Sequence, residues 1–107
     1  MDKQIFLKKE LSFTRRKEGQ LVREELYLNQ KDYDEYRYEF VIPENATSFE
    51  SAFYLGLLFD SVKKLGWDKF AQKYRFNLDN IVDSLRGCIR SQLDECERKA
   101  KNELTKR

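Results

Sequence analysis

The longest apolar stretch of the chain, from Thr47 to Leu65, limits its fold more than any other feature. Inside it, the run AFYLGLLF at 52–59 carries no charge. A helix that is apolar on nearly all sides must be buried, because an exposed side would leave apolar surface in water. Thr47 and Glu50 make the T-x-x-E pattern of a capping box, and Gly66 suits the position after the last turn. The stretch therefore predicts a buried helix over 48–65.

Gly56 stands in the middle of this predicted helix. A glycine there costs about 1 kcal/mol of helix stability relative to alanine. We expect that cost to be offset by a close approach between the helix and a sheet.

Three stretches before the helix alternate between apolar and polar residues, which is the pattern of half-buried strands. They cover residues 5–13, 21–28 and 36–42, and turns are predicted between them at 14–20 and 29–34. Proline cannot donate to a strand ladder, so Pro43 ends the last strand. Because the connections are short, we predict a three-stranded antiparallel meander with one covered face.

After the helix, residues 67–76 have an ambiguous period. They are either a short edge strand, which we favour over 72–76, or a turn of helix capped by Asp68. From Leu78 to Leu104, apolar residues recur every three or four positions and predict a long helix with Asn77 as its N-cap. The expected fold is α+β (or α/β) in two layers: an antiparallel meander, with a possible fourth short strand, covered by two helices.

The 107 residues make a single predicted domain, 1–107, with 93–107 as a projecting helical tail. A helix over 78–104 would be about 40 Å long, which exceeds the width of a compact domain of this length, about 33 Å. The apolar stripe nevertheless continues into the overhang. We therefore expect either a frayed tail or a homodimer through Leu93, Cys96, Ala100 and Leu104.

The composition excludes several classes of function. The chain has no histidine and only two cysteines, so we expect no metal, no cofactor and no enzyme activity. A net charge of +2 is too small to argue for nucleic acid by itself. No apolar run is long enough for a membrane span, and the first ten residues lack the apolar core of a signal peptide. A cytoplasmic location is the resulting expectation.

Two groups of residues have both a plain and a functional interpretation. Arg15, Arg16 and Lys17 place three positive charges at a predicted hairpin tip, which would either be solvated or contact phosphate or an acidic partner. The tyrosines suit either half-buried strands or a protein interface, because tyrosine combines apolar area with a polar tip. They are Tyr27, Tyr33, Tyr36, Tyr38 and Tyr54.

Residues 34–90 resemble a divergent STAS-like domain, the group related to bacterial anti-sigma-factor antagonists. The similar parts are EYRYEFVI, then TSF opening a helix with AFYLGLL, then KKLG, KFAQKYRF and NIVDSL. Members of this family that act as regulators have a serine or threonine at the start of this helix, which a kinase partner phosphorylates. The resemblance implies that role for Ser48 or for its neighbour Thr47. An oxyanion at a helix start would meet backbone N–H groups and the positive end of the dipole.

We therefore expect a non-enzymatic regulator that binds a protein partner through the loop 43–48 and the start of the following helix. The candidate contact residues are Glu44, Asn45, Tyr36 and Tyr38. The alternative is a small phage or mobile-element inhibitor, or a nucleic-acid-associated protein, acting through the basic tip at 15–17 and the last helix. The steep salt dependence of nucleic-acid binding would distinguish the two.

Overall fold

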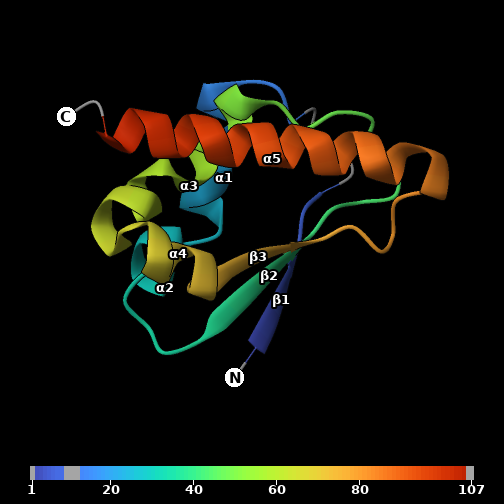
Figure 1. Ribbon diagram of the computed structural model, residues 1–107. Coiled ribbons are helices and arrows are strands. Elements are labelled where there is room, and N and C mark those ends of the chain that lie inside the picture. Colours follow the sequence, from blue (N-terminus) through green and yellow to red (C-terminus); the bar gives the residue numbers. More distant parts are fainter. Residues whose placement is uncertain (1, 9–12, 106–107) are drawn as a thin grey trace.

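The computed structural model describes residues 2–8 and 13–105, and they form a three-stranded sheet packed against helices (Figure 1). The strands are β1 (Asp2–Phe6), β2 (Arg37–Val41) and β3 (Tyr74–Asn77). The helices are α1 (Arg16–Glu25), α2 (Leu28–Lys31), α3 (Ser51–Leu65), α4 (Trp67–Lys73) and α5 (Asp83–Thr105). Helices therefore separate every strand from the next.

The sheet is parallel throughout, so the predicted antiparallel meander is wrong. The strand order is β1-β2-β3, and the register pairs Ile5 with Phe40 and Phe40 with Phe76. Parallel neighbours need a long crossover rather than a tight turn, and helices supply it here. All three strands consequently end at the same edge of the sheet, which decides what can lie close together there.

The predicted strand at 21–28 is wrong, because this segment belongs to α1 and α2. The same residues satisfy a helical period, since Gly19, Val22 and Arg23 lie on one buried face of α1. Leu21 is exposed on the opposite side of the helix. The segment 14–20, predicted as a turn, supplies the first turn of α1. A short segment whose sequence fits both the helical and the strand period takes the structure that its tertiary contacts favour. Here the contact with α3 favours a helix.

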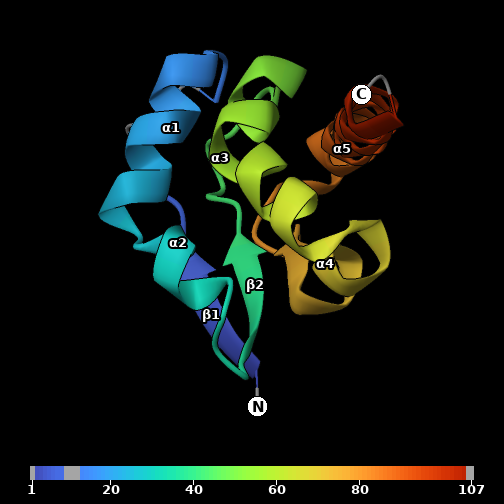
Figure 2. The ribbon, with the colours of Figure 1, turned by 90° about the vertical axis from the view of Figure 1, so that its left-hand side faces the viewer.

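The buried helix is confirmed as α3, although it begins at Ser51 rather than at residue 48. Its midpoint meets α1 instead of the sheet. A Cβ atom on Gly56 would lie 2.0 Å from the carbonyl oxygen of Arg16, and one on Gly19 would lie 2.3 Å from that of Phe53. The close approach expected at Gly56 is therefore a helix–helix contact, in which two glycines let the backbones of α1 and α3 touch (Figure 2).

Residues 67–77 contain both of the elements that the sequence left open. Trp67–Lys73 form α4, and Tyr74–Asn77 form β3, close to the strand favoured over 72–76. Asn77 ends that strand and does not cap a helix. Its side-chain oxygen accepts a hydrogen bond from the Asp79 amide at 2.7 Å, which makes a turn that delays the next helix to Asp83.

Up to Thr105, the last helix does not project as a tail, and residues 106–107 of the predicted tail lie outside the described part of the chain. With 23 residues α5 is about 34 Å long, and the molecule measures 36 × 31 × 23 Å. It runs across the top of the molecule in Figure 1, where it packs against α3. Near its end, Glu103 lies 3.6 Å from Arg16, and the Lys101 ammonium lies 4.8 Å from the centre of the Trp67 ring. The final turns are thus held by α1 and α4.

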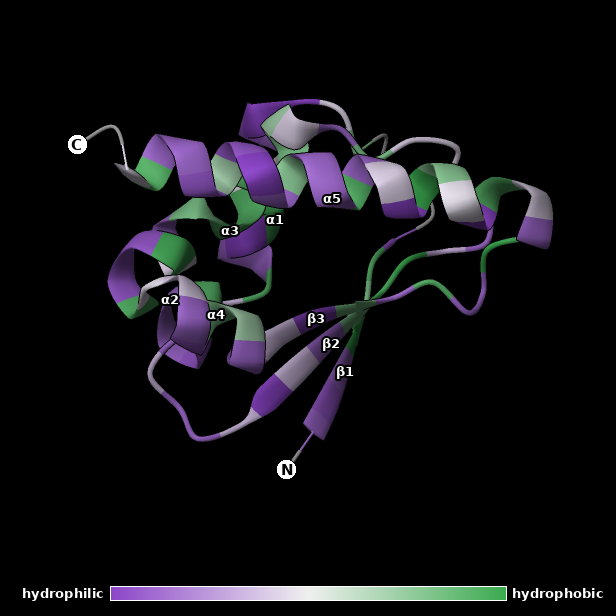
Figure 3. Cartoon of the chain, in the orientation of Figure 1, coloured by the Kyte–Doolittle hydropathy of each residue, from purple (hydrophilic) through white to green (hydrophobic). Residues whose placement is uncertain are grey.

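The two faces of the sheet differ in character. Tyr38, Phe40 and Tyr74 are buried on the face that the helices cover. The opposite face is polar and paired within itself: Glu39 accepts hydrogen bonds from Gln4 at 2.9 Å and from Asn77 at 3.1 Å. Figure 3 shows β1 as mostly hydrophilic. A polar face of this kind can stay in water, so the sheet needs helices on one side only.

Candidate functional site

The loop 43–48 follows β2 at the carboxyl edge of the sheet, and its ends are fixed by backbone hydrogen bonds. On one side, the Ile42 amide donates to the Asn77 carbonyl at 3.1 Å, and the Ala46 amide donates to the Pro43 carbonyl at 3.1 Å. On the other side, the Phe49 amide donates to the side-chain oxygen of Gln92. Pro43 and Ala46 are buried, whereas Glu44, Asn45 and Thr47 are exposed. The loop therefore displays three polar residues on an ordered backbone.

A hollow of about 440 Å³ adjoins this loop at the ends of β1 and β2. Its lining includes Phe6, Val41, Pro43, Glu44 and Asn80. The Leu7 amide donates to the Val41 carbonyl at 3.1 Å and holds the two strand ends together. Phe6 is 64% exposed, which is unusual for a phenylalanine. We call this region the carboxyl-end surface and define it by Phe6, Pro43, Glu44, Asn45, Thr47 and Asn80.

The phosphorylation candidates lie in the loop, not in the first turn of α3. Glu50 is the N-cap residue, and no side chain caps the helix there, so the predicted Thr47–Glu50 capping box is wrong. The reason is Phe49, which is fully buried and stacks on Phe13 with ring centres 5.4 Å apart. Burying that ring keeps 47–50 extended, and the Glu50 amide donates to the Phe13 carbonyl at 2.9 Å. Thr47 is exposed, whereas Ser48 is half-buried.

Two of the predicted contact residues lie at the other end of β2. Tyr36 precedes the strand and Tyr38 is its second residue, whereas Glu44 and Asn45 follow it. Tyr38 is buried, donates its hydroxyl hydrogen bond to Asp34, and stacks on Tyr74 at 5.8 Å. The structure thus places Glu44 in the lining of the same hollow as Phe6, with Asn45 next to Glu44 in the loop, and leaves Tyr36 and Tyr38 out of this surface.

Of the remaining tyrosines, Tyr54 is buried in α3. Tyr27 and Tyr33 are exposed, beside and just after α2.

The basic tip is not a hairpin. Arg15 occupies the N-cap position of α1, and Arg16 and Lys17 lie in its first turn. Arg16 is turned toward the rest of the molecule, with Glu103 at 3.6 Å and the Phe59 ring at 5.9 Å. On α5, Arg86 donates to the Ile81 carbonyl at 2.9 Å, and Arg98 pairs with Glu95. Much of the basic charge is therefore engaged within the molecule.

The residues proposed to form a dimer seam pack within their own chain. Leu93, Cys96 and Ala100 are at most 1% exposed, and Leu104 is half-buried against the core. The Cys96 thiol lies 3.7 Å from the Phe49 carbonyl oxygen, so the helix rests on the segment that precedes α3. The apolar stripe of α5 that led us to expect a homodimer is thus covered by α3 and by the segment that precedes α3.

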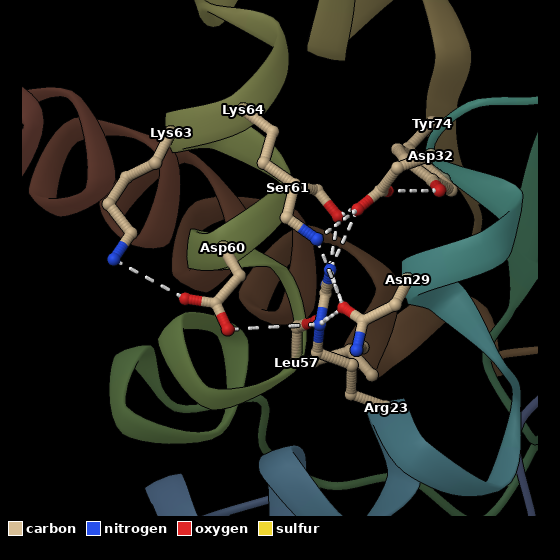
Figure 4. Close-up of polar contacts among 9 residues, drawn as sticks. All are labelled: Arg23, Asn29, Asp32, Leu57, Asp60, Ser61, Lys63, Lys64 and Tyr74. Atoms are coloured by element: carbon tan, nitrogen blue, oxygen red, sulfur yellow. Dashed lines mark hydrogen bonds and ion pairs between the residues drawn. The ribbon is translucent and has the colours of Figure 1, made fainter.

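A buried polar cluster joins α1, α2, α3 and β3, and sequence reasoning missed it (Figure 4). The Arg23 guanidinium lies 2.7 Å from Asp32, and both side chains are at most 5% exposed. Ser61 and Tyr74 donate to the other Asp32 oxygen at 2.6 and 2.7 Å. Burial and the hydrogen bond to Asp32 raise the pKa of the Tyr74 hydroxyl, which therefore stays protonated.

The remaining Arg23 donors are also engaged. They bond to the Leu57 carbonyl at 2.9 Å, to the Ser61 hydroxyl at 2.8 Å and to the Asn29 side chain at 2.9 Å. A buried ion pair is tolerated when its remaining donors and acceptors have partners, as these do. The cluster therefore fixes the helices and offers no open position for a ligand. The available signal was Arg23 itself, a charged residue on the buried face of a helix with Val22.

Within residues 2–8 and 13–105, no group of three or more metal-ligating side chains converges. None of the helices in this part of the chain is long and apolar enough to cross a membrane. Comparison of the chain with models of known families, with curated proteins and with solved structures gives no match. The function must therefore be argued from the surface itself.

Proposed function

We propose that this protein is a non-enzymatic, cytoplasmic regulatory module that binds a protein partner through the carboxyl-end surface. The observation that carries the proposal is the ordered loop 43–48 beside the exposed ring of Phe6. The buried polar cluster does not compete with this interpretation, because its donors and acceptors are already paired within the described residues.

The position of the surface supports binding. In sheets of parallel strands, ligands bind outside the carboxyl ends of the strands, where the loops lie on a rigid scaffold. An ordered loop loses little conformational entropy when a partner docks, so more of the contact energy appears as affinity. An exposed aromatic ring next to a hollow is the usual form of an anchor residue in a protein interface. Phe6 supplies the ring, and Glu44, Asn45 and Thr47 supply polar contacts.

The resemblance to STAS-like domains supports a regulatory form of this binding. We propose that Thr47 or Ser48 accepts a phosphate from a kinase partner. A phosphate there adds about two negative charges beside Glu44, and like-charge repulsion changes what this surface can bind. The exposure of Thr47 makes its hydroxyl the more accessible of the two.

The test is retention of partners by immobilised protein from the native cell, quantified for each variant. Phe6→Thr removes the ring and keeps a β-branched residue suited to a strand. Tyr33→Thr is the matched control, because Tyr33 is 74% exposed and lies outside the carboxyl-end surface. We expect at least one protein from the cell whose retention falls by about tenfold or more with the Phe6→Thr and Glu44→Lys variants. The Tyr33→Thr variant should retain the same protein as well as the wild type does. If no retained protein shows this selectivity, the proposal fails.

The same experiment tests the nucleic-acid alternative. Binding through Arg15 and Lys17 would weaken steeply with salt and would be lost in an Arg15→Gln, Lys17→Gln variant. We expect retention to survive both the added salt and that double substitution.

A further inference from the structure

A second hollow, of about 290 Å³, lies between α3, α4, β3 and α5, and it shares no lining residue with the carboxyl-end surface. Half of the residues that line it are aromatic: Tyr54, Trp67, Phe70, Tyr74 and Phe76. These rings pack against one another. The ring centres of Tyr54 and Phe76 are 5.9 Å apart in a stacked pair, and those of Trp67 and Phe70 are 5.3 Å apart. Because the walls are already packed, the site is formed before anything binds.

Tyr54 gives this hollow a buried polar group. The residue is 1% exposed, yet its hydroxyl has no hydrogen-bond partner among the described residues. In the same part of the chain, every side-chain oxygen or nitrogen that is fully cut off from solvent has a partner. The Tyr54 hydroxyl must therefore open on the hollow that it lines. Burial raises the pKa of this hydroxyl, so it keeps its proton and can donate a hydrogen bond.

Three charged side chains also line the hollow: Arg75 of β3, which pairs with Asp2 at 3.3 Å, and two residues of α5. Arg90 and Glu97 line the hollow, seven residues apart and therefore on one face of the helix. Among the described residues, no carboxylate lies within ion-pairing distance of Arg90, whereas Arg86 and Arg98 each have such a partner. Burial and the charge of Asp94 raise the pKa of Glu97, against the opposing charges of Lys101 and Arg90. Its carboxylate acts against an anion in the hollow.

We propose that this hollow binds a small planar aromatic carboxylate, with the ring between the aromatic walls and the carboxylate on Arg90 and the Tyr54 hydroxyl. Offset and edge-on contacts between rings favour a planar ligand over an aliphatic one of similar size. Guanidinium is the side-chain group best matched to a carboxylate. A volume near 300 Å³ is at the small end of ligand sites, which suits one ring or a fused pair.

Trp67, the only tryptophan of the chain, lines the hollow and reports its occupancy directly. The full chain is titrated with benzoate and with indole-3-carboxylate, and binding is followed by Trp67 fluorescence and by NMR shifts. We expect saturation with dissociation constants of about 1 mM or below. Cyclohexanecarboxylate, which has the charge without the planar ring, and benzamide, which has the ring without the charge, should each bind about tenfold more weakly.

Variants assign the contacts. Tyr54→Phe and Arg90→Gln should each weaken benzoate binding by about tenfold or more, because each removes a donor to the carboxylate. Arg98→Gln is the matched control on the same helix, since Arg98 pairs with Glu95 outside the hollow, and it should leave binding unchanged. Glu97→Gln should strengthen binding. Without ligand, Tyr54→Phe should unfold at the same denaturant concentration as the wild type or a higher one, because the Tyr54 hydroxyl bonds to no group within residues 2–8 and 13–105.

The proposal is overturned if neither acid gives a saturable change at about 10 mM, roughly ten times the weakest expected dissociation constant. It is also overturned if cyclohexanecarboxylate binds as well as benzoate, or if Tyr54→Phe and Arg90→Gln bind like Arg98→Gln. A partner lost from the carboxyl-end surface would leave these results unaffected, so the two proposals fail separately.

Discussion

Gly19 and Gly56 matter because each is the only residue type that fits where α1 crosses α3. We predict that Gly56→Ala destabilises the protein by about 2 kcal/mol or more. The added Cβ would lie 2.0 Å from a backbone oxygen of Arg16, which cannot move without shifting α1. Gly87→Ala is the control, since Gly87 lies in α5 with open space around it, and it should stabilise by about 0.5–1 kcal/mol. Urea denaturation measures both; equal effects would mean that the helices do not touch there.

Asp34 gives stability a defined pH dependence. Burial alone would raise the pKa of Asp34, but hydrogen bonds from Lys73, Tyr38 and the Tyr36 amide outweigh it and hold the pKa below its usual value. A folded-state pKa below the unfolded one adds stability above the unfolded value, about 3.9, and that stability disappears as the pH falls further. We expect Asp34→Asn to lose about 1–3 kcal/mol near neutral pH and the difference from the wild type to shrink as the pH falls below about 3.9. A constant difference between the two proteins across that range would contradict the assignment.

Thr47 and Ser48 allow a direct test of the regulatory proposal. Thr47→Asp and Ser48→Asp should each change the affinity for the partner. Because Thr47 is exposed, Thr47→Asp should also leave the unfolding free energy within about 0.5 kcal/mol of the wild type. Retention assays and denaturation are run on the same preparations, with the two alanine variants as controls. Identical retention by the alanine, aspartate and wild-type proteins would exclude a phosphate switch in this loop.

Single residues were partly readable from the sequence. Gly56 indicated a close approach, but the expected partner, the sheet, is wrong, because the backbone of α1 lies there. Ser48 was misplaced because a T-x-x-E pattern describes local capping only, and the burial of Phe49 overrides it. Arg23 and Asp32 were missed because charged residues are expected outside unless a partner is known, and their partner lies nine residues away across a turn.

At the scale of elements, long periodic segments were predictable and short ones were not. The helix α5 buries a stripe that the local period reveals, and α3 is marked by an uninterrupted apolar run. The segment 21–28 fits both periods, and only tertiary contact with α3 selects the helix. Because this segment was assigned as a strand, the helical crossover between β1 and β2 was interpreted as a hairpin. The parallel sheet could therefore not be predicted.

The packing of α5 leads to a prediction about truncation. A chain ending at Gln92 would lose Leu93, Cys96 and Ala100, which are buried in the full chain. We expect it to bind a hydrophobic dye, to melt at a lower temperature than the full chain and to show no change in oligomeric state by sedimentation. The opposite result has two parts: the full chain is a dimer, and the truncated chain is as stable as the full chain. That result would support pairing of residues 93–104 with a second copy.

At the scale of the whole molecule, the direction of the strands creates the carboxyl-end surface. The parallel register pairs Phe6 with Val41, which lies two residues before the start of the loop 43–48. An antiparallel pairing of the same strands would put Phe6 opposite Arg37, at the far end of β2. The surface was therefore not derivable from the sequence, although Glu44, Asn45 and Thr47 had been singled out as candidates, and their role stays a prediction.

NMR cross-strand contacts in the isotopically labelled full chain test this account most directly. Parallel pairing predicts contacts of the Leu7 amide with Val41 and of Ile5 with Phe40, together with protection of the Leu7 amide by the Val41 carbonyl at 3.1 Å. Contacts of Phe6 with Arg37 and of Asp2 with Val41 would show an antiparallel pair. That result would separate Phe6 from the loop 43–48 and contradict the proposed binding surface.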